Sequence, residues 1–224
     1  MNANIRLELI HTAREMAASG LNRGTAGNLS ARGDWEGRPG FWITPTGMAY
    51  ANLQPADIPF VDLEQAADAD SPRRNAASPR KASSEWRLHL DLYRTHPEAT
   101  AILHAHSPFA TSLACLRREI PPFHYMIARF GGNTVRCAPY ALFGTQALSD
   151  AAVAAMQDRS ACLLANHGMV VCAAGLGPAL DAAIELESLC EQYWRACQLG
   201  TPVILGDAEM AEVKLRFAGY GKQD

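Results

Sequence analysis

The order of apolar and polar positions predicts a helix and then a group of short strands at the start of the chain. Over residues 4–19 apolar side chains recur at helical spacing, and Gly20 closes the pattern. From there to Gly47 glycines are frequent and short apolar runs alternate with turn residues, which is typical of a mostly antiparallel sheet. Along the whole chain, strands are expected at residues 29–31, 41–43, 58–63, 101–105, 135–138, 161–164 and 169–173.

The later part of the pattern predicts longer helices. A helix is expected to begin at Ser83 and Ser84, because a serine hydroxyl can cap a helix and an apolar face starting at Trp86 follows. Residues 64–82, just before it, contain few bulky apolar side chains, so we expect an exposed loop there. Further helices are expected at residues 108–116, 145–157, 178–199 and 207–217.

These elements alternate without the regular rhythm of a β-α-β protein. We therefore expect an α/β fold in which helices cover both faces of a central sheet. The 224 residues suit one such domain, residues 1–224, and 48% hydrophobic residues supply its core. The chain contains neither G-x-G-x-x-G nor G-x-x-x-x-G-K-[ST], so it lacks the usual signatures of dinucleotide and P-loop nucleotide sites.

Charge and apolar run lengths narrow the set of partners. A net charge of −3 provides no basic field that could hold nucleic acid. The first residues do not show a basic segment followed by an apolar one, and no apolar run approaches the thickness of a bilayer. We expect a cytoplasmic protein that binds a small molecule rather than nucleic acid or a membrane.

Three histidines lie in or beside expected buried strands. His104 and His106 alternate along one strand, so their side chains project from one face, about 7 Å apart along the chain. His167 lies in the turn between two other strands and could add a third nitrogen. Three imidazoles with an open position are how proteins hold a catalytic zinc ion. The alternative is that each ring is an ordinary hydrogen-bonded histidine of the core.

Polar residues near the expected helix start could bind an anion. Ser83 and Ser84 offer hydroxyls and free N–H groups at a helix N-terminus, and Glu85 is a carboxylate able to move a proton near the metal. Two glycine-containing turns, at residues 24–28 and 44–47, could add donors to the same anion. The alternatives are an ordinary helix cap and ordinary turns.

Two tyrosines are further candidates. Tyr125 lies between a helix and a run of glycines, where a phenol could act as a general acid, although such a tyrosine is more often part of a core. Tyr220 lies in the tail, which is either a lid or a fraying end.

Taken in order, these segments carry a resemblance to a known family. They read GLNRGTAGNLS, ITPTGM, SSEWRLH, HAH, HYM, CAPYALFGT and NHG, from residue 20 to residue 168. In this combination the chain resembles the class II aldolase/adducin-head family, over nearly its whole length, and most closely the branch that acts on L-fuculose 1-phosphate. The resemblance implies a three-layer α/β/α fold with a mostly antiparallel sheet, a cyclic homotetramer and active sites between subunits.

The resemblance also implies a role for particular residues. His104, His106 and His167 correspond to the ligands of Zn²⁺, and Glu85 to the catalytic acid/base. Tyr125, from the neighbouring subunit, corresponds to the acid that protonates the aldehyde oxygen. The phosphate site corresponds to Thr25, Asn28, Thr46, Gly47, Ser83 and Ser84. The pocket for the aldehyde corresponds to Phe143 and Tyr220.

The reaction so implied is the cleavage of a ketose 1-phosphate to dihydroxyacetone phosphate and a small aldehyde, through a metal-stabilised enediolate. For L-fuculose 1-phosphate the aldehyde is L-lactaldehyde. Burial of Glu85 beside apolar Trp86 is expected to raise the pKa of its carboxyl. Other activities of the same fold stay open: cleavage of 5-deoxyribulose or 5-methylthioribulose 1-phosphate, a ribulose-phosphate epimerase, and a methylthioribulose-phosphate dehydratase. An adducin-like oligomerising module is the alternative without catalysis, but such a module would be expected to lack the three histidines.

Overall fold

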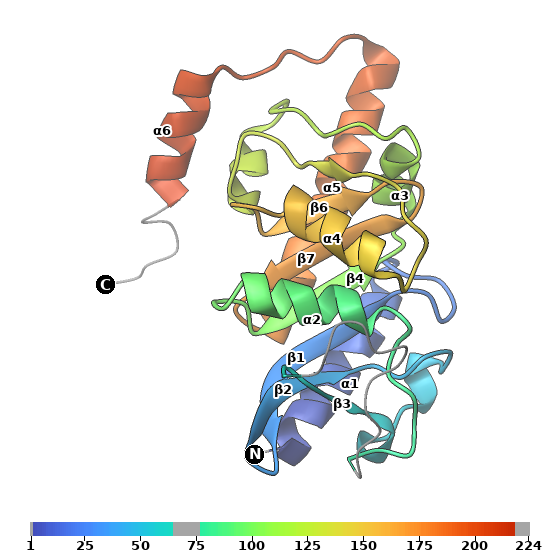
Figure 1. Cartoon of the computed structure of the whole chain (residues 1–224). Helices are drawn as coiled ribbons and strands as arrows, with labels where there is room; N and C mark the ends of the chain where they lie inside the picture. Colours follow the sequence, from blue (N-terminus) through green and yellow to red (C-terminus); the bar gives the residue numbers. More distant parts are fainter. Residues whose placement is uncertain (1, 65–76, 218–224) are drawn as a thin grey trace.

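The computed structural model describes residues 2–64 and 77–217, which build a seven-stranded sheet between two layers of helices (Figure 1). The strands are β1 (Asn28–Trp35), β2 (Arg38–Ile43), β3 (Phe60–Asp62), β4 (Ala101–Ala105), β5 (Cys137–Ala138), β6 (Ala161–Leu164) and β7 (Gly168–Ala173). Their order across the sheet is β3-β2-β1-β4-β7-β6-β5. Every neighbouring pair is antiparallel except β5 and β6. The mostly antiparallel sheet expected from the sequence is confirmed.

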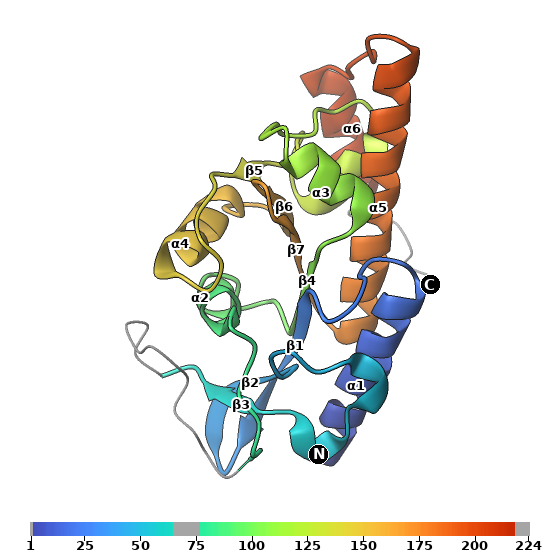
Figure 2. The ribbon, with the colours of Figure 1, turned by 90° about the vertical axis from the view of Figure 1, so that its right-hand side faces the viewer.

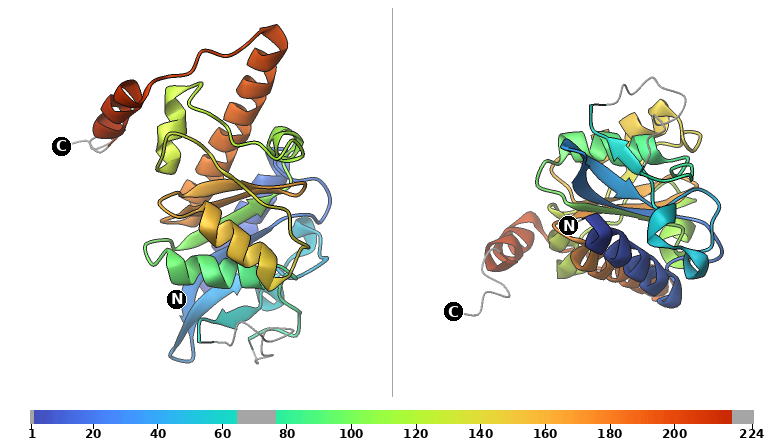
Figure 3. Two further views of the ribbon diagram at one scale, coloured as in Figure 1. Left: turned by 45° about the horizontal axis from the view of Figure 1, so that its top comes forward. Right: turned by 90° about the horizontal axis from the view of Figure 1, so that it is seen from below.

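Helices cover both faces of this sheet, as Figure 2 shows. On one side lie α1 (Asn2–Ala18), α3 (Pro108–Ala114) and α5 (Leu176–Leu199). On the other side lie α2 (Trp86–Thr95) and α4 (Gln146–Ala155). The last helix, α6 (Asp207–Phe217), lies apart from the sheet and packs against the 3₁₀ helix Tyr125–Phe130 (Figure 3). The three-layer α/β/α arrangement is therefore confirmed.

Alternate residues of β4 enter two separate hydrophobic cores. Leu103 packs into the core beneath α1 and α5, whereas Ile102 packs into the core beneath α2 and α4. Successive side chains of a strand point to opposite faces, so His104 shares the face of Ile102. This alternation turns His104 toward α2 and places its ring below the N-terminus of that helix.

Some strand limits differ from those expected. β1 and β2 extend several residues further and pair up to Trp35 and Arg38, because Glu36 and Gly37 both have positive φ and form a two-residue hairpin turn. β5 is shorter than expected, since Val135 pairs with Ile120 in an isolated bridge rather than with β6. These differences arise at tight turns and edge bridges, which apolar periodicity does not record.

The start of α2 also differs. The helix begins at Trp86, with Glu85 as its N-cap residue and no capping bond from a side chain. The hydroxyl of Ser83 instead accepts a hydrogen bond from the N–H of Glu85, at 3.3 Å. The expectation that a serine caps this helix is therefore wrong.

Two sequence-based expectations concern loops and membranes. Of the expected loop at residues 64–82, residues 65–76 lie outside the described part of the chain, and Ala82 forms an isolated bridge with Pro45. Within residues 2–64 and 77–217, no helix combines the length and the apolar character needed to cross a membrane.

Candidate metal centre and active site

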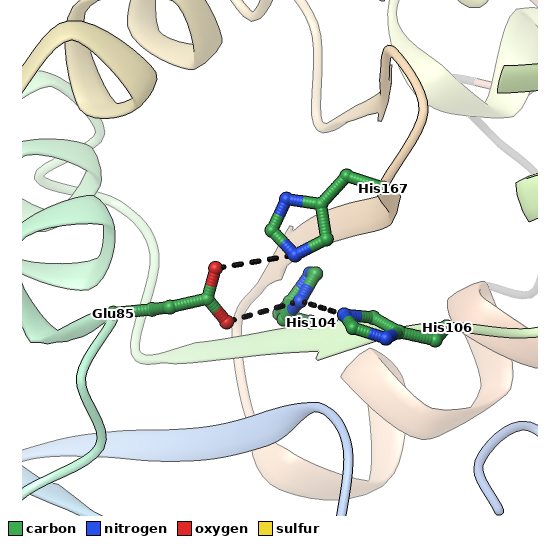
Figure 4. Close-up of side chains that lie close together, drawn as sticks. All are labelled: Glu85, His104, His106 and His167. Carbon is green, nitrogen blue, oxygen red and sulfur yellow. Dashed lines mark hydrogen bonds and ion pairs between the residues drawn. The ribbon is translucent and has the colours of Figure 1, made fainter. Parts of the chain in front are cut away.

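Glu85, His104, His106 and His167 converge on one point beside the N-terminus of α2 (Figure 4). One ligand atom from each side chain lies within 4.8 Å of the other three. Nε2 of His104 is 3.0 Å from Nε2 of His106 and 3.1 Å from Oε2 of Glu85. Nε2 of His167 is 3.3 Å from Oε1 of Glu85. The sequence predicted these four residues as neighbours, and the fold brings them together.

The sheet positions the three imidazoles. His104 lies on β4, and His106 follows two residues later, just beyond the strand end. The main-chain N–H of His106 donates to Oδ1 of buried Asn22 at 2.8 Å, which holds the chain there. His167 lies in the turn joining β6 to β7, next to Asn166, whose φ of 54° is one that asparagine tolerates better than most residues.

The tautomer of His104 suits a metal ion. Nδ1 of this ring lies 2.8 Å from the main-chain oxygen of Met169. A carbonyl oxygen only accepts hydrogen bonds, so Nδ1 carries a proton and the neutral ring presents the lone pair of Nε2 to the cluster. A second hydrogen bond that orients the ring in this way is typical of histidines that bind metals. The donor set, three imidazole nitrogens and a nearby carboxylate, fits a divalent ion such as zinc.

The charges of the cluster also favour a cation. Burial lowers the pKa of His104, but the Glu85 carboxylate more than compensates, so the pKa is raised. Burial and the charge of His104 lower the pKa of His106 and of His167, each to about 4. The rings of His106 and His167 are therefore neutral near pH 7, and each can offer a nitrogen lone pair to a cation.

Glu85 does not have the raised pKa that the sequence predicted. Burial does raise its pKa, but the charge of His104 and its hydrogen bond, with a smaller effect of His167, outweigh this and hold the pKa below its usual range. The expectation considered only the apolar neighbour Trp86. It is wrong because the carboxylate contacts two imidazoles, and a positive charge nearby favours the ionised form.

The two carboxylate oxygens of Glu85 differ in their surroundings. Oε2 accepts a hydrogen bond from Nδ2 of Asn28 at 2.9 Å. Oε1 is buried and, within the described residues, accepts no hydrogen bond, although Nε2 of His167 lies nearby. A buried oxygen without a hydrogen bond is uncommon and costly. Oε1 is therefore the oxygen available to a substrate proton.

A cavity of about 380 Å³ opens above the cluster. Its wall includes all six residues expected at a phosphate site: Thr25, Asn28, Thr46, Gly47, Ser83 and Ser84. The remaining wall contains Tyr140, Ala141, Phe143 and Asn166, together with Glu85, His106 and His167. No lysine or arginine of the described residues lines it. An anion bound there would be held by hydroxyls and N–H groups rather than by a countercharge.

Among the described residues, one expected site residue outside the histidine cluster does not line this cavity. Tyr125 is about half exposed, and its ring stacks on His124 and lies near Phe217 of α6, away from the cavity lining. Tyr220 lies outside the described residues. Phe143, by contrast, lines the cavity as expected.

Sequence reasoning missed three supporting contacts. Asn22 holds the main chain of His106, Asn28 holds Glu85, and His89 lies within 2.5 Å of Oδ1 of Asn28. Asn28 was expected only as a phosphate ligand. The helical spacing from Trp86 could have shown that His89 faces inward, but its partner on β1 could be found only from the tertiary structure.

Comparison with known proteins identifies the family of this chain. Residues 7–194 match the family model described as Class II Aldolase and Adducin N-terminal domain. The chain is 48% identical over 218 residues to 5-methylthioribulose-1-phosphate/5-deoxyribulose-1-phosphate aldolase of Rhodospirillum rubrum, covering 97% of this chain and 92% of that protein. It is 40% identical over 215 residues to L-fuculose phosphate aldolase of Escherichia coli K12, covering 96% and 94%.

Solved structures show the same relationship. A structure of L-fuculose 1-phosphate aldolase matches with a TM-score of 0.86 and 38% identity, and the match covers 96% of both chains. The family resemblance expected from the sequence is thereby confirmed. The chain belongs to the class II aldolase and adducin family, and it is an enzyme of the aldehyde-lyase class.

Proposed function

We propose that this protein is a zinc-dependent aldolase that cleaves a ketose 1-phosphate into dihydroxyacetone phosphate and a small aldehyde. The observation that carries the proposal is the composition of one cavity. It combines neutral donors for an anion, the Glu85 carboxylate with the imidazoles of His106 and His167, and an apolar wall formed by Tyr140, Ala141 and Phe143. The buried ring of His104 completes the cluster beside Glu85. A sugar phosphate has these same three parts: a phosphate, a reacting carbon chain and a distal substituent.

The hydroxyls near the start of α2 are proposed to bind the phosphate. Thr25, Thr46, Ser83 and Ser84 all line the cavity, and α2 begins at Trp86, two residues after Ser84. A helix N-terminus with free N–H groups favours an anion even where no cation is near. This binding fixes the phosphate end, so the reacting carbons of the substrate lie over the imidazole cluster.

Glu85 is proposed to move the proton at the substrate carbon. In cleavage, the proton of the C4 hydroxyl passes to the ionised Glu85 carboxylate, the C3–C4 bond breaks, and the bonding electrons pass toward the C2 carbonyl. His104, His106 and His167 would hold a divalent ion, which would supply the Lewis acid that this charge requires. Oε1 of Glu85, which accepts no hydrogen bond from the described residues, then returns a proton to C3 of the dihydroxyacetone phosphate fragment.

The neighbouring subunit is proposed to complete the site. Tyr125 is not at the cavity of its own chain, yet the resemblance assigns it to protonation of the aldehyde oxygen. A homotetramer in which Tyr125 of one chain reaches the cavity of the next would account for its exposure.

For the substrate, we propose 5-methylthioribulose 1-phosphate and 5-deoxyribulose 1-phosphate, with L-fuculose 1-phosphate as the second candidate. The two ribulose phosphates are supported by 48% identity to the Rhodospirillum rubrum aldolase. L-Fuculose 1-phosphate is supported by 40% identity to the Escherichia coli enzyme and by the structural match. The three substrates differ only at the aldehyde end. The apolar side chains of Tyr140, Ala141 and Phe143 fit a methyl or methylthio group.

A direct comparison of kcat/KM for the three phosphates, with the zinc-loaded protein, tests this order. We expect a higher value for the two ribulose derivatives than for L-fuculose 1-phosphate. A higher value for L-fuculose 1-phosphate would reverse the order. Formation of an epimerised or dehydrated sugar without any triose phosphate would contradict the aldolase itself.

A further inference from the structure

A chain of buried polar side chains continues from Glu85 into the interior, away from the cavity. Nδ2 of Asn28 donates to Oε2 of Glu85 at 2.9 Å, and Nε2 of His89 lies 2.5 Å from Oδ1 of Asn28. Oγ of Ser30 lies 2.7 Å from Nδ1 of His89 and 2.9 Å from the hydroxyl of Tyr93. His89, Ser30 and Tyr93 are essentially without solvent exposure. Five side chains are therefore linked between the site and the core.

The two secondary structures make this chain possible. Asn28 and Ser30 are two residues apart on β1 and project from one face, while His89 and Tyr93 are four residues apart on α2 and lie one turn apart. α2 lies on that face of the sheet, so the two pairs meet. The ring of Phe41 also stacks beside His89, at 6.4 Å between centroids, which limits where the imidazole can lie.

Each hydrogen bond between these five side chains has a single possible direction. An ionised carboxylate only accepts, so Asn28 turns its NH₂ group to Glu85 and its carbonyl oxygen to His89. That carbonyl oxygen can only accept, so Nε2 of His89 carries a proton. Burial, followed by the charge of His104, lowers the pKa of His89 to about 3, so Nδ1 is unprotonated near pH 7 and accepts from Ser30. Ser30 then accepts from the hydroxyl of Tyr93, whose pKa burial raises.

Rotation of the Asn28 amide would break this order. Its carbonyl oxygen would then face the carboxylate of Glu85, and its NH₂ group would face the N–H of His89. Both new contacts are repulsive, and water cannot relieve the one with His89, because that ring is fully buried and does not line the cavity. His89 excludes the rotated amide because its Nε2 carries a proton. A residue without an N–H group at this position would allow both orientations of the Asn28 amide.

We propose that His89 is a positioning residue, which fixes the Asn28 amide so that Glu85 is held by Oε2 and keeps Oε1 free for the substrate proton. The inference rests on the proposed function of Glu85. It adds that the reactive oxygen is selected by a neutral histidine that contacts neither the cavity nor the metal cluster.

Three variants, assayed as full-length zinc-loaded protein, separate positioning from simple structural support. His89→Leu removes the donor, and we expect kcat to fall roughly 10- to 100-fold, with KM and zinc content nearly unchanged. His89→Gln restores an N–H group at a similar reach and should recover most of kcat. Tyr93→Phe removes a buried hydroxyl from the far end of the same chain and should lower thermal stability while leaving kcat unchanged.

The inference would be overturned if His89→Leu kept the kcat of the wild-type protein. It would also be overturned if His89→Leu and Tyr93→Phe both lost kcat in proportion to their losses of thermal stability. A second measurement stays informative if His89→Leu does not fold: ¹⁵N NMR of the wild-type histidines. We expect a neutral His89 with its proton on Nε2 at pH 7, and a proton on Nδ1, or on both nitrogens, would contradict it. If the wild-type protein cleaved no ketose phosphate, the proposed function would fail. The NMR result would still decide the direction of the hydrogen bonds that link Glu85 to Tyr93.

Discussion

Asn28 of β1 is paired directly with His104 of β4. Directly opposed residues of neighbouring strands project from the same face of a sheet, so the two side chains lie side by side. Oε2 of Glu85 receives a hydrogen bond from Asn28 at 2.9 Å and lies 3.1 Å from Nε2 of His104. The sheet register therefore fixes where the carboxylate lies relative to the first imidazole, and the proposed chemistry depends on that relationship.

Glu85→Gln should separate proton transfer from metal binding. The amide has nearly the same shape but cannot carry the proton, so we expect kcat to fall by roughly 10²- to 10⁴-fold. The three imidazoles remain, so zinc content should stay near that of the wild-type protein. Triose phosphate release and elemental analysis of the same sample measure both. Full activity in this variant would show that another group moves the proton.

His106→Ala should remove both zinc and turnover. This ring is one of three neutral nitrogens in the cluster, and two imidazoles alone hold the ion far less tightly. His11→Ala is the matched control, because His11 lies on α1, is 73% exposed and pairs only with Glu15 among the contacts described. We expect the control to keep its zinc. Stoichiometric zinc in purified His106→Ala would exclude His106 as a ligand.

Gly27→Ala should disturb the metal centre indirectly. A Cβ at Gly27 would lie 2.2 Å from Nδ2 of Asn22 and 2.6 Å from the main-chain oxygen of His104. Displaced Asn22 would release the main chain of His106, which it holds by a 2.8 Å hydrogen bond. We expect weaker zinc binding, measured by competition with a chelator.

Gly24→Ala is the control for that variant. Gly24 also has a positive φ, 70° against 74° at Gly27, but a Cβ there would meet nothing within 4 Å. Both alanines carry similar backbone strain, so a difference in zinc affinity reports the contact with Asn22. Equal zinc affinity in the two variants would argue against the role given to Asn22.

If neighbouring subunits share each active site, two inactive variants should restore activity when they assemble together. Tyr125→Phe and Glu85→Gln should each be nearly inactive alone. In mixed assemblies of the two, some cavities would combine an intact Glu85 with an intact Tyr125 from the neighbouring chain. Random mixing in a ring should restore about a quarter of wild-type activity. Hybrids verified by two affinity tags that stay inactive would contradict a Tyr125 supplied by the neighbour.

Much of the fold could be predicted from the sequence because apolar periodicity records which face of an element is buried. β4, β6 and β7 lie where short apolar runs indicated, and α5 begins within two residues of its expected start. The length of the β1–β2 hairpin could not be predicted in this way. Its outer residues are polar, and its turn depends on the positive φ of Glu36 and Gly37.

Some features of the site could be predicted from the sequence, and others could not. The spacing of His104 and His106 on a strand and the turn at His167 indicated a possible three-imidazole site, but the family resemblance was needed to prefer it to three ordinary core histidines. The low pKa of Glu85, the contact of Asn22 with His106 and the link from Asn28 to His89 were not predictable. Each depends on a partner distant in the chain, and only the sheet register and the packing of α2 define it.

The most direct test of the whole account is release of dihydroxyacetone phosphate from 5-deoxyribulose 1-phosphate, 5-methylthioribulose 1-phosphate and L-fuculose 1-phosphate, coupled to a reducing enzyme. Each reaction is run as purified, after a chelator, and after zinc is added back. We expect release from at least one substrate, which the chelator abolishes and zinc restores. Release that continues after complete removal of the metal, or none from any substrate with zinc bound, would contradict a zinc-dependent aldolase.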